Sequence, residues 1–273
     1  MPELPEVETV ARNLRAPLIG RTIIAAHVYW PRTVAQPSVR EFTRRLSGLR
    51  IRAIERRAKY LVFALSASAP QRLGVYLLVH LKMSGHLDVK SDRAPIEKHD
   101  RVILDLSGGR RLHFNDTRKF GRMHLVPHPE VVTGRLGPEP LSDEFTPGVF
   151  KRQLGKRKGR LKSLLLDQTF VAGIGNIYAD EALWLARLHP LRRADSLSDA
   201  EIRALYRAIR AVLRDGIRRN GASFDWVYPS GDYEFRVYDR ADRPCRRCRH
   251  PIRRMVVGQR GTYFCAMCQT LGG

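Results

Sequence analysis

The spacing of apolar residues divides the chain into regions of different predicted structure. From Pro5 to about Leu18, apolar side chains recur every three or four positions, and Gly20 follows them. This period predicts a helix at the start of the chain. From about residue 22 to residue 126, short apolar or alternating runs predict strands, and we expect a two-sheet β-sandwich. The runs are TIIAAHVYW, YLVFAL, GVYLLVHLKM, RVILDL and RLHFND.

The second half of the chain returns to helical spacing. The segment HPEVVTGRLGPEPLSDEFTP is rich in Pro and Gly and predicts a link between two domains. Beyond it, helical spacing is found in PGVFKRQL, LKSLLLDQ, NIYADEALWLARL and SDAEIRALYRAIRAVLRDGIRRNG. In the last of these, Ser198 is a good N-cap, with Glu201 at capping-box distance. After a short polar loop, EFRVYDR and GTYFCAMC predict strands at the C-terminal end.

All four cysteines of the chain lie in this C-terminal end. They form two Cys-x-x-Cys pairs separated by sixteen residues: Cys245, Cys248, Cys265 and Cys268. The spacing is typical of a site in which four thiolates hold zinc. The alternative is two disulfides, which a reducing compartment disfavours. We therefore expect one structural Zn²⁺, with no open position for an activated water.

The charge of the chain is far from balanced. Its 49 Lys and Arg residues against 27 Asp and Glu give a net charge of +22 and a pI near 10.7, and Arg supplies most of the excess. A polyanion, most simply nucleic acid, is the expected partner. The alternative is the surface of a thermophilic or halotolerant protein, but such surfaces tend to balance both signs. No uncharged apolar run of about 18 residues and no signal pattern is found, so we expect a cytoplasmic protein that does not bind membranes.

Three short segments contain candidates for nucleic-acid contacts. Arg118 and Phe120 in NDTRKFG lie on one side of an extended chain, where a cation and a ring suit a gap in a base stack. Met83 in HLKMSG lies in a predicted turn as an apolar wedge, and Lys59 in RRAKYLVF stands at the mouth of an apolar strand. Each has an ordinary structural alternative: a side chain that packs under its own loop, or a solvated lysine at a strand edge.

A fourth segment, VAGIGNIYADEALW, has glycines directly before a predicted helix that starts near Asn176. The backbone N–H groups of such a turn, together with the helix dipole, could receive a phosphate. The alternative is a tight turn between two helices. The segment is not a dinucleotide-binding fingerprint, because it lacks the G-x-G-x-x-G spacing in a βαβ unit.

The first residues, MPELPEVETV, admit two interpretations. If Met1 is removed, Pro2 becomes an N-terminal secondary amine, which is a candidate nucleophile. Alternatively, Pro5 opens a helix and Glu6 lies near the positive end of its dipole. Taken alone, this stretch favours the second interpretation.

Together these segments resemble the formamidopyrimidine-DNA glycosylase family. The resemblance extends in order over nearly the whole chain, through MPELPEVET, RRAKYL, HLKMSG, KHDRVIL, DTRKFG, LGPEPLSDEF, LLLDQTFVAGIGNIYADEALW and the cysteine pairs. The sister family, endonuclease VIII, is an alternative, although Leu4 and the KHD and LGPEPLS segments favour the formamidopyrimidine branch. A non-catalytic zinc protein that binds DNA is the alternative from another class.

The resemblance implies a bifunctional DNA glycosylase and AP lyase of base excision repair that excises oxidised purines. Pro2 would attack the sugar C1′, and the resulting Schiff base would permit β- and δ-elimination. Glu3 would protonate the sugar ring oxygen, Glu6 would support the site by hydrogen bonding, and Lys59 would contact phosphate and assist base loss. The implied fold is α+β: an N-terminal helix, a two-sheet β-sandwich, a helix-two-turn-helix domain and a zinc finger with a β-hairpin.

The resemblance also implies how damaged double-stranded DNA is held, by a monomer bound to the nucleoid. Met83, Arg118 and Phe120 would fill the space left by a flipped nucleotide, with Arg118 facing the orphaned cytosine. The phosphates around the lesion would be gripped by residues spread along the chain, namely His80, Lys162, Asn176 and Arg260. The zinc finger would supply Arg260, which we count with the catalytic group.

The expected domains and two departures from the family complete these predictions. We expect a catalytic domain over 1–130, a linker over 131–148, the helix-two-turn-helix domain over 149–228 and the zinc finger over 235–273. Lys82 replaces the usual glycine beside the wedge methionine. The segment between Gly221 and Tyr238 is shorter than the family loop that closes over 8-oxoguanine, so formamidopyrimidines and abasic sites are the firmer substrate predictions.

Overall fold

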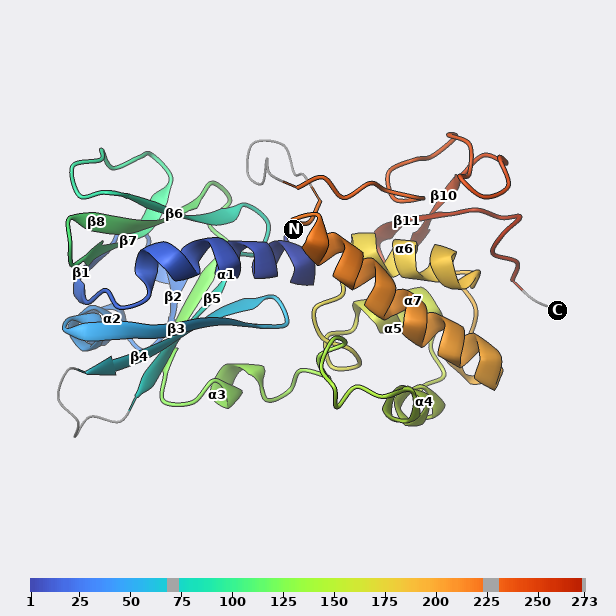
Figure 1. The fold of residues 1–273 in the computed structure, drawn as a ribbon, viewed down its shortest axis with the longest axis horizontal. Helices are drawn as coiled ribbons and strands as arrows, with labels where there is room; N and C mark the ends of the chain where they lie inside the picture. Colours follow the sequence, from blue (N-terminus) through green and yellow to red (C-terminus); the bar gives the residue numbers. More distant parts are fainter. Residues whose placement is uncertain (68–73, 223–230, 272–273) are drawn as a thin grey trace. The chain divides into compact units, whose positions relative to one another are not determined.

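The computed structural model describes residues 1–67, 74–222 and 231–271, and the chain forms two compact units (Figure 1). Among these residues, the N-terminal unit holds 1–2 and 6–135, and the C-terminal unit holds 3–5, 136–222 and 231–271. The division falls inside the predicted linker, while the four domain boundaries expected from the sequence stay a prediction.

The N-terminal unit consists of helix α1 (Leu4–Leu18), most of which belongs to it, and two sheets. The first sheet has the order β1 (Ile23–Val28), β7 (Asp100–Leu106), β8 (Arg110–Asp116) and β6 (Gly85–Ser91). The second has the order β2 (Val34–Gln36), β9 (Arg122–Val126), β5 (Val75–His80), β4 (Tyr60–Ala67) and β3 (Leu49–Arg57). Three short helices complete it: η1 (Pro31–Thr33), α2 (Val39–Leu46) and α3 (Glu130–Thr133).

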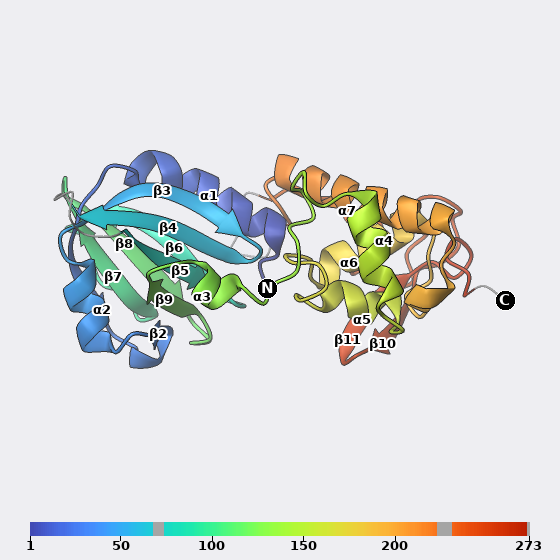
Figure 2. The ribbon, with the colours of Figure 1, turned by 90° about the horizontal axis from the view of Figure 1, so that it is seen from below.

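The core of this unit is built from alternate strand positions. In β4, Leu61 and Phe63 point into the core, and Val62 faces the other side, because successive side chains of a strand alternate. Apolar residues of α1 join the same core, and Figures 1 and 2 show this helix running along the sheets. The predicted N-terminal helix and two-sheet architecture are therefore confirmed.

The C-terminal unit is helical and ends in a β-hairpin. Its elements are α4 (Pro147–Gly155), α5 (Leu161–Leu166), α6 (Asn176–Ala186), η2 (Ala194–Ser196), α7 (Asp199–Arg218), β10 (Arg253–Val257) and β11 (Arg260–Phe264). Ser198 and Glu201 form the predicted capping box at the start of α7. The hairpin contacts α6 through β11 (Figure 1). None of the helices in the described residues has the length and apolarity needed to cross a bilayer.

One predicted strand is wrong. The segment EFRVYDR forms no strand, because its backbone donors are used elsewhere. The N–H groups of Arg236, Val237 and Tyr238 donate to the carboxylate of Glu181, over 2.8 to 3.0 Å. Glu181 is fully buried in α6, and a buried carboxylate needs such donors. The segment therefore wraps around an anion instead of pairing with a neighbouring strand.

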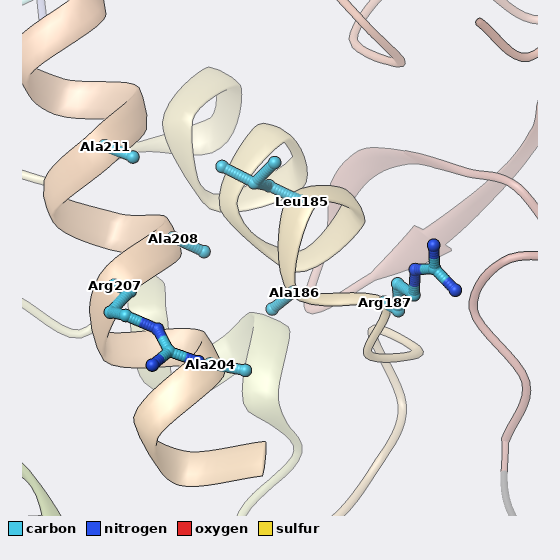
Figure 3. Close-up of a pocket in the computed structure, with 7 residues that line it drawn as sticks. All are labelled: Leu185, Ala186, Arg187, Ala204, Arg207, Ala208 and Ala211. Carbon is cyan, nitrogen blue, oxygen red and sulfur yellow. The ribbon is translucent and has the colours of Figure 1, made fainter. Parts of the chain in front are cut away.

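A shallow hollow of about 360 Å³ lies in the C-terminal unit, between the end of α6 and one side of α7 (Figure 3). Three alanines of α7 line it, together with Leu185, Ala186, Arg187 and Arg207. None of the residues singled out from the sequence lines this hollow. The candidate site is therefore sought where those residues lie.

Candidate functional site

The predicted site residues divide between the two units. The N-terminal unit holds Pro2, Glu6, Lys59, His80, Met83, Arg118 and Phe120. The C-terminal unit holds Glu3, Lys162, Asn176, Arg260 and the four cysteines. The division falls between the consecutive residues Pro2 and Glu3.

Glu3 lies at the N-terminus of α6 and is almost completely buried. Its carboxylate accepts hydrogen bonds from the N–H groups of Gly175 at 2.7 Å, Ile177 at 2.9 Å and Tyr178 at 3.3 Å. A helix N-terminus favours an anion because its first N–H groups lack partners within the helix. The anion here is a side chain of the chain itself. Glu3 thus takes three N–H groups of this turn, and the interpretation of the turn as a backbone cradle for phosphate stays a prediction.

The glycines of this turn are required by close approach. A Cβ on Gly175 would lie 2.4 Å from the carboxyl carbon of Glu3, and one on Gly173 would lie 2.7 Å from Leu4. Gly173 also has a φ of +87°, which favours glycine. Gln168 closes the turn, since its amide accepts from the N–H of Gly173 and donates to the carbonyl of Ile174. The turn is thus shaped to receive Glu3.

The start of α6 is bonded to the zinc-finger hairpin. The side-chain amide of Asn176 donates to the carbonyl of Gly261 at 2.8 Å, and the N–H of Tyr263 donates to Asp180 at 3.0 Å. Arg260, the first residue of β11, is exposed and next to Gly261. The Asn176 Oδ1 atom is buried and has no partner among the described residues. Asn176 therefore bonds the residue next to Arg260, and both lie in the C-terminal unit.

Lys162 does not lie where the sequence-based prediction placed it. Its side chain is fully buried, and its Nζ donates to Asp180 at 2.6 Å and to the carbonyl of Asn176 at 2.9 Å. Burial lowers the pKa of Lys162 and raises that of Asp180 to about 7, because both lose solvation of their charged forms. A phosphate contact through this ammonium does not fit its burial. Lys162 instead connects α5 to the start of α6 through these two hydrogen bonds.

The three predicted wedge residues lie on two neighbouring turns of the N-terminal unit. Met83, between β5 and β6, and Phe120, between β8 and β9, expose 44% and 52% of their surface. Both side chains therefore project from their turns instead of packing under them. The guanidinium of Arg118 lies 3.4 Å from the sulfur of Met83. Met83 and Arg118 are therefore in contact.

One buried carboxylate holds both turns. Asp116 accepts from the hydroxyl of Ser84 at 2.5 Å and from the N–H groups of Arg118 at 3.2 Å and Gly121 at 2.7 Å. Its own carbonyl accepts from the guanidinium of Arg101 at 2.8 Å. Ser84 belongs to the turn of Met83, and the other two donors belong to the turn of Phe120. Asp116 therefore fixes the spacing of the wedge residues.

Lys59 and His80 lie close together on the second sheet. Lys59 follows Ala58 in the turn between β3 and β4 and is 5% exposed. His80 is nearly buried, and burial lowers its pKa to about 3, with Lys82, Lys59 and His124 adding to the shift. The Nδ1 of this neutral ring accepts from the N–H of Lys82 at 3.0 Å. The ring proton is therefore on Nε2, which makes that atom a hydrogen-bond donor.

Pro2 and Glu6 lie at the start of α1. Pro2 precedes the helix, and Glu6 lies in its first turn with 1% of its surface exposed. Pro5 is the second residue of the helix. The helix-start interpretation of these residues therefore holds in the structure, and it is compatible with a chemical role for Pro2.

The four cysteines meet the geometry of a zinc site. Their sulfurs all lie within 4.8 Å of one another, with 3.3 Å between Cys248 and Cys265 and 4.0 Å between Cys245 and Cys268. A tetrahedral Zn²⁺ with Zn–S bonds of about 2.3 Å needs sulfurs about 3.8 Å apart. The indole N–H of Trp184 points at the sulfur of Cys245 at 3.4 Å. These four residues can hold one structural zinc ion.

Comparison with family models matches three consecutive parts of the chain. The formamidopyrimidine-DNA glycosylase N-terminal domain matches residues 1–123, and the H2TH domain of that enzyme matches residues 136–226. The zinc finger found in FPG and IleRS matches residues 243–271. The chain belongs to the formamidopyrimidine-DNA glycosylase family. The zinc assignment of the four cysteines and the predicted α+β fold are confirmed with it.

Relatives and solved structures are similar to this glycosylase along nearly its full length. Formamidopyrimidine-DNA glycosylases of Chloroflexus aggregans and Herpetosiphon aurantiacus are 48% and 44% identical, with 99% and 98% of this chain and 99% and 100% of theirs covered. The Lactococcus lactis Fpg structure with DNA containing N7-benzyl-Fapy-dG has a TM-score of 0.90 at 36% identity, covering 98% of this chain and 100% of that one. A MutM structure with DNA containing carbocyclic 8-oxo-G gives 0.91 at 36% identity, with the same coverage.

Three acidic residues that position parts of this glycosylase were missed in the sequence: Asp116, Asp180 and Glu181. Asp116 ends an apolar strand just before a turn, a place where a carboxylate often binds turn N–H groups. Asp180 and Glu181 stand in an otherwise apolar helix, and a charge in such a helix indicates a buried partner. These signals were present, but the contacts of Asp116 with Ser84, of Asp180 with Tyr263 and of Glu181 with Val237 join distant parts of the sequence.

We predict that Cys248→Ser releases the zinc ion and sharply weakens DNA binding, because the finger that contains Arg260 loses its fold. The matched control is Met267→Ser, a change at a side chain that is 58% exposed between two ligands. Metal analysis after dialysis measures zinc, and a binding titration measures affinity. Zinc at one equivalent together with wild-type affinity in Cys248→Ser would refute the four-thiolate assignment.

Proposed function

We propose that this protein is a bifunctional DNA glycosylase and AP lyase that excises oxidised purines during base excision repair. The observation that carries the proposal is the fixed position of the Glu3 carboxylate on α6, directly after the candidate nucleophile Pro2. Membership of the formamidopyrimidine-DNA glycosylase family supports it. The proposed place of action is the DNA of the nucleoid in the cytoplasm.

Pro2 is the proposed nucleophile once Met1 is removed. An α-amino group has a pKa near 8, about two units below that of lysine, so a useful neutral fraction exists at neutral pH. The nitrogen lone pair forms a bond to the sugar C1′, and the bond from C1′ to the ring oxygen breaks as Glu3 donates a proton to that oxygen. The amine proton then passes to the base, and the bond from C1′ to the base breaks with its electron pair leaving on the base, which gives an iminium. This electron sink permits β-elimination of the 3′ phosphate and then δ-elimination of the 5′ phosphate.

Glu3 is the proposed proton donor to the sugar ring oxygen, and afterwards it moves protons during the eliminations. Three N–H groups hold its carboxylate in one orientation, which is what a proton-transfer group requires. Glu6, buried in the first turn of α1, is proposed to support the site. The backbone N–H groups at the start of α6 therefore set the position of the carboxylate that transfers the proton.

The target nucleotide has to leave the duplex before Pro2 can reach it, at a cost of a few kcal/mol. We propose that Met83, Arg118 and Phe120 fill the vacated space, with Arg118 facing the unpaired base. Their exposure and the contact between Met83 and Arg118 support this role. Arg118 supplies donors for a base edge, while the two apolar side chains replace lost stacking.

The proposed phosphate contacts are made by Lys59, His80, Asn176 and Arg260. The Nε2–H of neutral His80 is a donor that needs no change of charge, and Arg260 is exposed for a charged contact. Lys162 is proposed to act indirectly, by holding Asn176 through its carbonyl. Zinc has no part in the chemistry; it holds the hairpin on which Arg260 lies.

Formamidopyrimidines and abasic sites are the proposed preferred substrates. Two solved structures of Lactococcus lactis Fpg contain DNA with N7-benzyl-Fapy-dG and DNA with an abasic site. The shortened segment between Gly221 and Tyr238 motivates a weaker preference for 8-oxoguanine, and residues 223–230 of it lie outside the described part of the chain. Excision compared on formamidopyrimidine, 8-oxoguanine and thymine-glycol duplexes also separates this proposal from an endonuclease VIII activity.

We predict that a protein that keeps Met1, or the variant Pro2→Gly, loses base excision by about a hundredfold or more while duplex affinity changes little. Chemistry depends on one secondary amine, whereas affinity is spread over many phosphates. Single-turnover excision and borohydride trapping measure the chemistry, and a titration with undamaged duplex measures the affinity.

Unchanged excision by a protein shown by mass spectrometry to retain Met1 would remove Pro2 from the mechanism. An absence of any borohydride adduct with the processed wild-type protein would favour the non-catalytic alternative, a zinc protein that only binds DNA.

We also predict that Asp116→Ala slows excision of a paired lesion by about ten- to a hundredfold, because the turns of Met83 and Phe120 lose their common anchor. Fluorescence of 2-aminopurine placed beside the lesion reports the nucleotide flipping directly. Asp105→Asn is the matched control, since Asp105 lies on the same sheet and pairs with Arg111 and His27 instead. Flipping at the wild-type rate in Asp116→Ala would contradict this positioning role.

A further inference from the structure

The outer face of the second sheet carries, beside His80, further basic groups that the proposed function does not use. In the register of the sheet, Arg122 of β9 lies opposite His80 of β5, and His80 lies opposite Tyr60 of β4. His124 is two positions beyond Arg122 and therefore lies on the same face. The Tyr60 ring lies 4.7 Å from the His80 ring and 6.4 Å from the His124 ring, between centroids. On this face of the sheet, the basic groups thus continue from His80 to Arg122 and His124 of β9.

Lys82 extends this cluster from the turn after β5. Its φ is +57°, a left-handed conformation that is unfavourable for a lysine and suits the glycine usual at this position. The conformation brings its N–H to the Nδ1 of His80. A strained residue of this kind suggests a functional reason, because glycine would relieve the strain.

The positive charges of this cluster lack acidic partners among the described residues. Burial lowers the pKa of Lys82, and Arg122 lowers it further. Burial also lowers the pKa of His124, and Arg122 and Lys82 add to that shift. The Nδ1 of His124 is buried with no hydrogen-bond partner in the described structure. The charges of Lys82 and Arg122 repel one another, which favours binding of an anion that would lower the energy of both.

Arg122 is held in a position that leaves donors available. Its Nη1 donates to the carbonyls of Lys119, Phe120 and Gly121, at 3.3, 3.1 and 2.8 Å. A guanidinium has five N–H donors in a rigid fork, so Nε and Nη2 remain for an anion. Because the accepting carbonyls belong to the turn of Phe120, the guanidinium is fixed beside the wedge.

We propose that Lys82, Arg122 and His124 form a further binding site for a backbone phosphate of duplex DNA, in addition to the contacts of Lys59 and His80. This site rests on the proposed function, since it takes the same polyanion. A phosphate diester fits because its oxygens accept from an ammonium, a guanidinium and a ring N–H at once. The site contacts only the DNA backbone and recognises neither a base sequence nor a lesion. It therefore strengthens binding to any duplex equally.

The test is the salt dependence of binding by Lys82→Gly. Glycine removes the charge and fits the left-handed backbone, so loss of folding does not confuse the result. Loss of one phosphate contact makes the slope of log affinity against log salt shallower by about 0.9. We expect this change, with about three- to tenfold weaker binding near 0.1 M salt, on undamaged and abasic duplexes alike. Lys82→Arg should keep the wild-type slope.

The control is Arg110→Gln, which removes one charge from an exposed arginine at the start of β8, on the other sheet. A wild-type slope in Lys82→Gly, or a change no larger than in Arg110→Gln, would overturn the site, as would a loss confined to lesion DNA. Wild-type protein is trapped with borohydride on abasic DNA in parallel. Failure of that trapping counts against the proposed function, whereas an unchanged slope with successful trapping counts against this site alone.

Discussion

The hydrogen bonds between the Glu3 carboxylate and the N-terminus of α6 are the constraint on which the proposed reaction centre depends. Three backbone N–H groups hold a side chain that directly follows Pro2 in the chain. A terminal residue is ordinarily poorly ordered, and a nucleophile has to be held still. Anchoring the next residue restricts the amine without occupying it. The close approach of Gly173 and Gly175 to Leu4 and Glu3 follows from the same requirement.

The bonds around α6 extend this order to the groups proposed to hold DNA. Asp180 pairs with Lys162 on one side and accepts from Tyr263 of the hairpin on the other, and Asn176 bonds Gly261. A buried ion pair costs desolvation, which its hydrogen bonds offset, so its main effect is on position. The zinc site includes Cys248, which precedes β10, and Cys265, which directly follows β11, so the zinc ion fixes the base of the hairpin. Arg260 is thus placed by two sets of contacts, while the wedge turns of the N-terminal unit are placed by Asp116.

Local patterns predicted the elements well and the buried polar contacts poorly. The period of α1, the apolar runs of β4 and β5, the capping box of α7 and the cysteine spacing each depend on neighbouring residues, and the structure has them. The predicted strand EFRVYDR failed because Glu181, more than 50 residues away, takes its N–H groups. The resemblance assigned Lys162 to phosphate, and its buried contact with Asp180 is not visible in the sequence. The bonds of the turn before Asn176 to the Glu3 carboxylate were not visible there either, because the two lie more than 170 residues apart.

The central claim, that Glu3 is held on α6 to transfer protons during base release, is tested most directly with Glu3→Gln. Glutamine keeps the size of the side chain but cannot donate and recover a proton in the same way. Single-turnover base release from a formamidopyrimidine duplex is compared with borohydride trapping on a duplex that already contains an abasic site. The account predicts that base release falls by about a hundredfold or more while the trapped adduct still forms. Base release within about threefold of the wild-type rate, far less than the loss typical of removing a general acid, would contradict it.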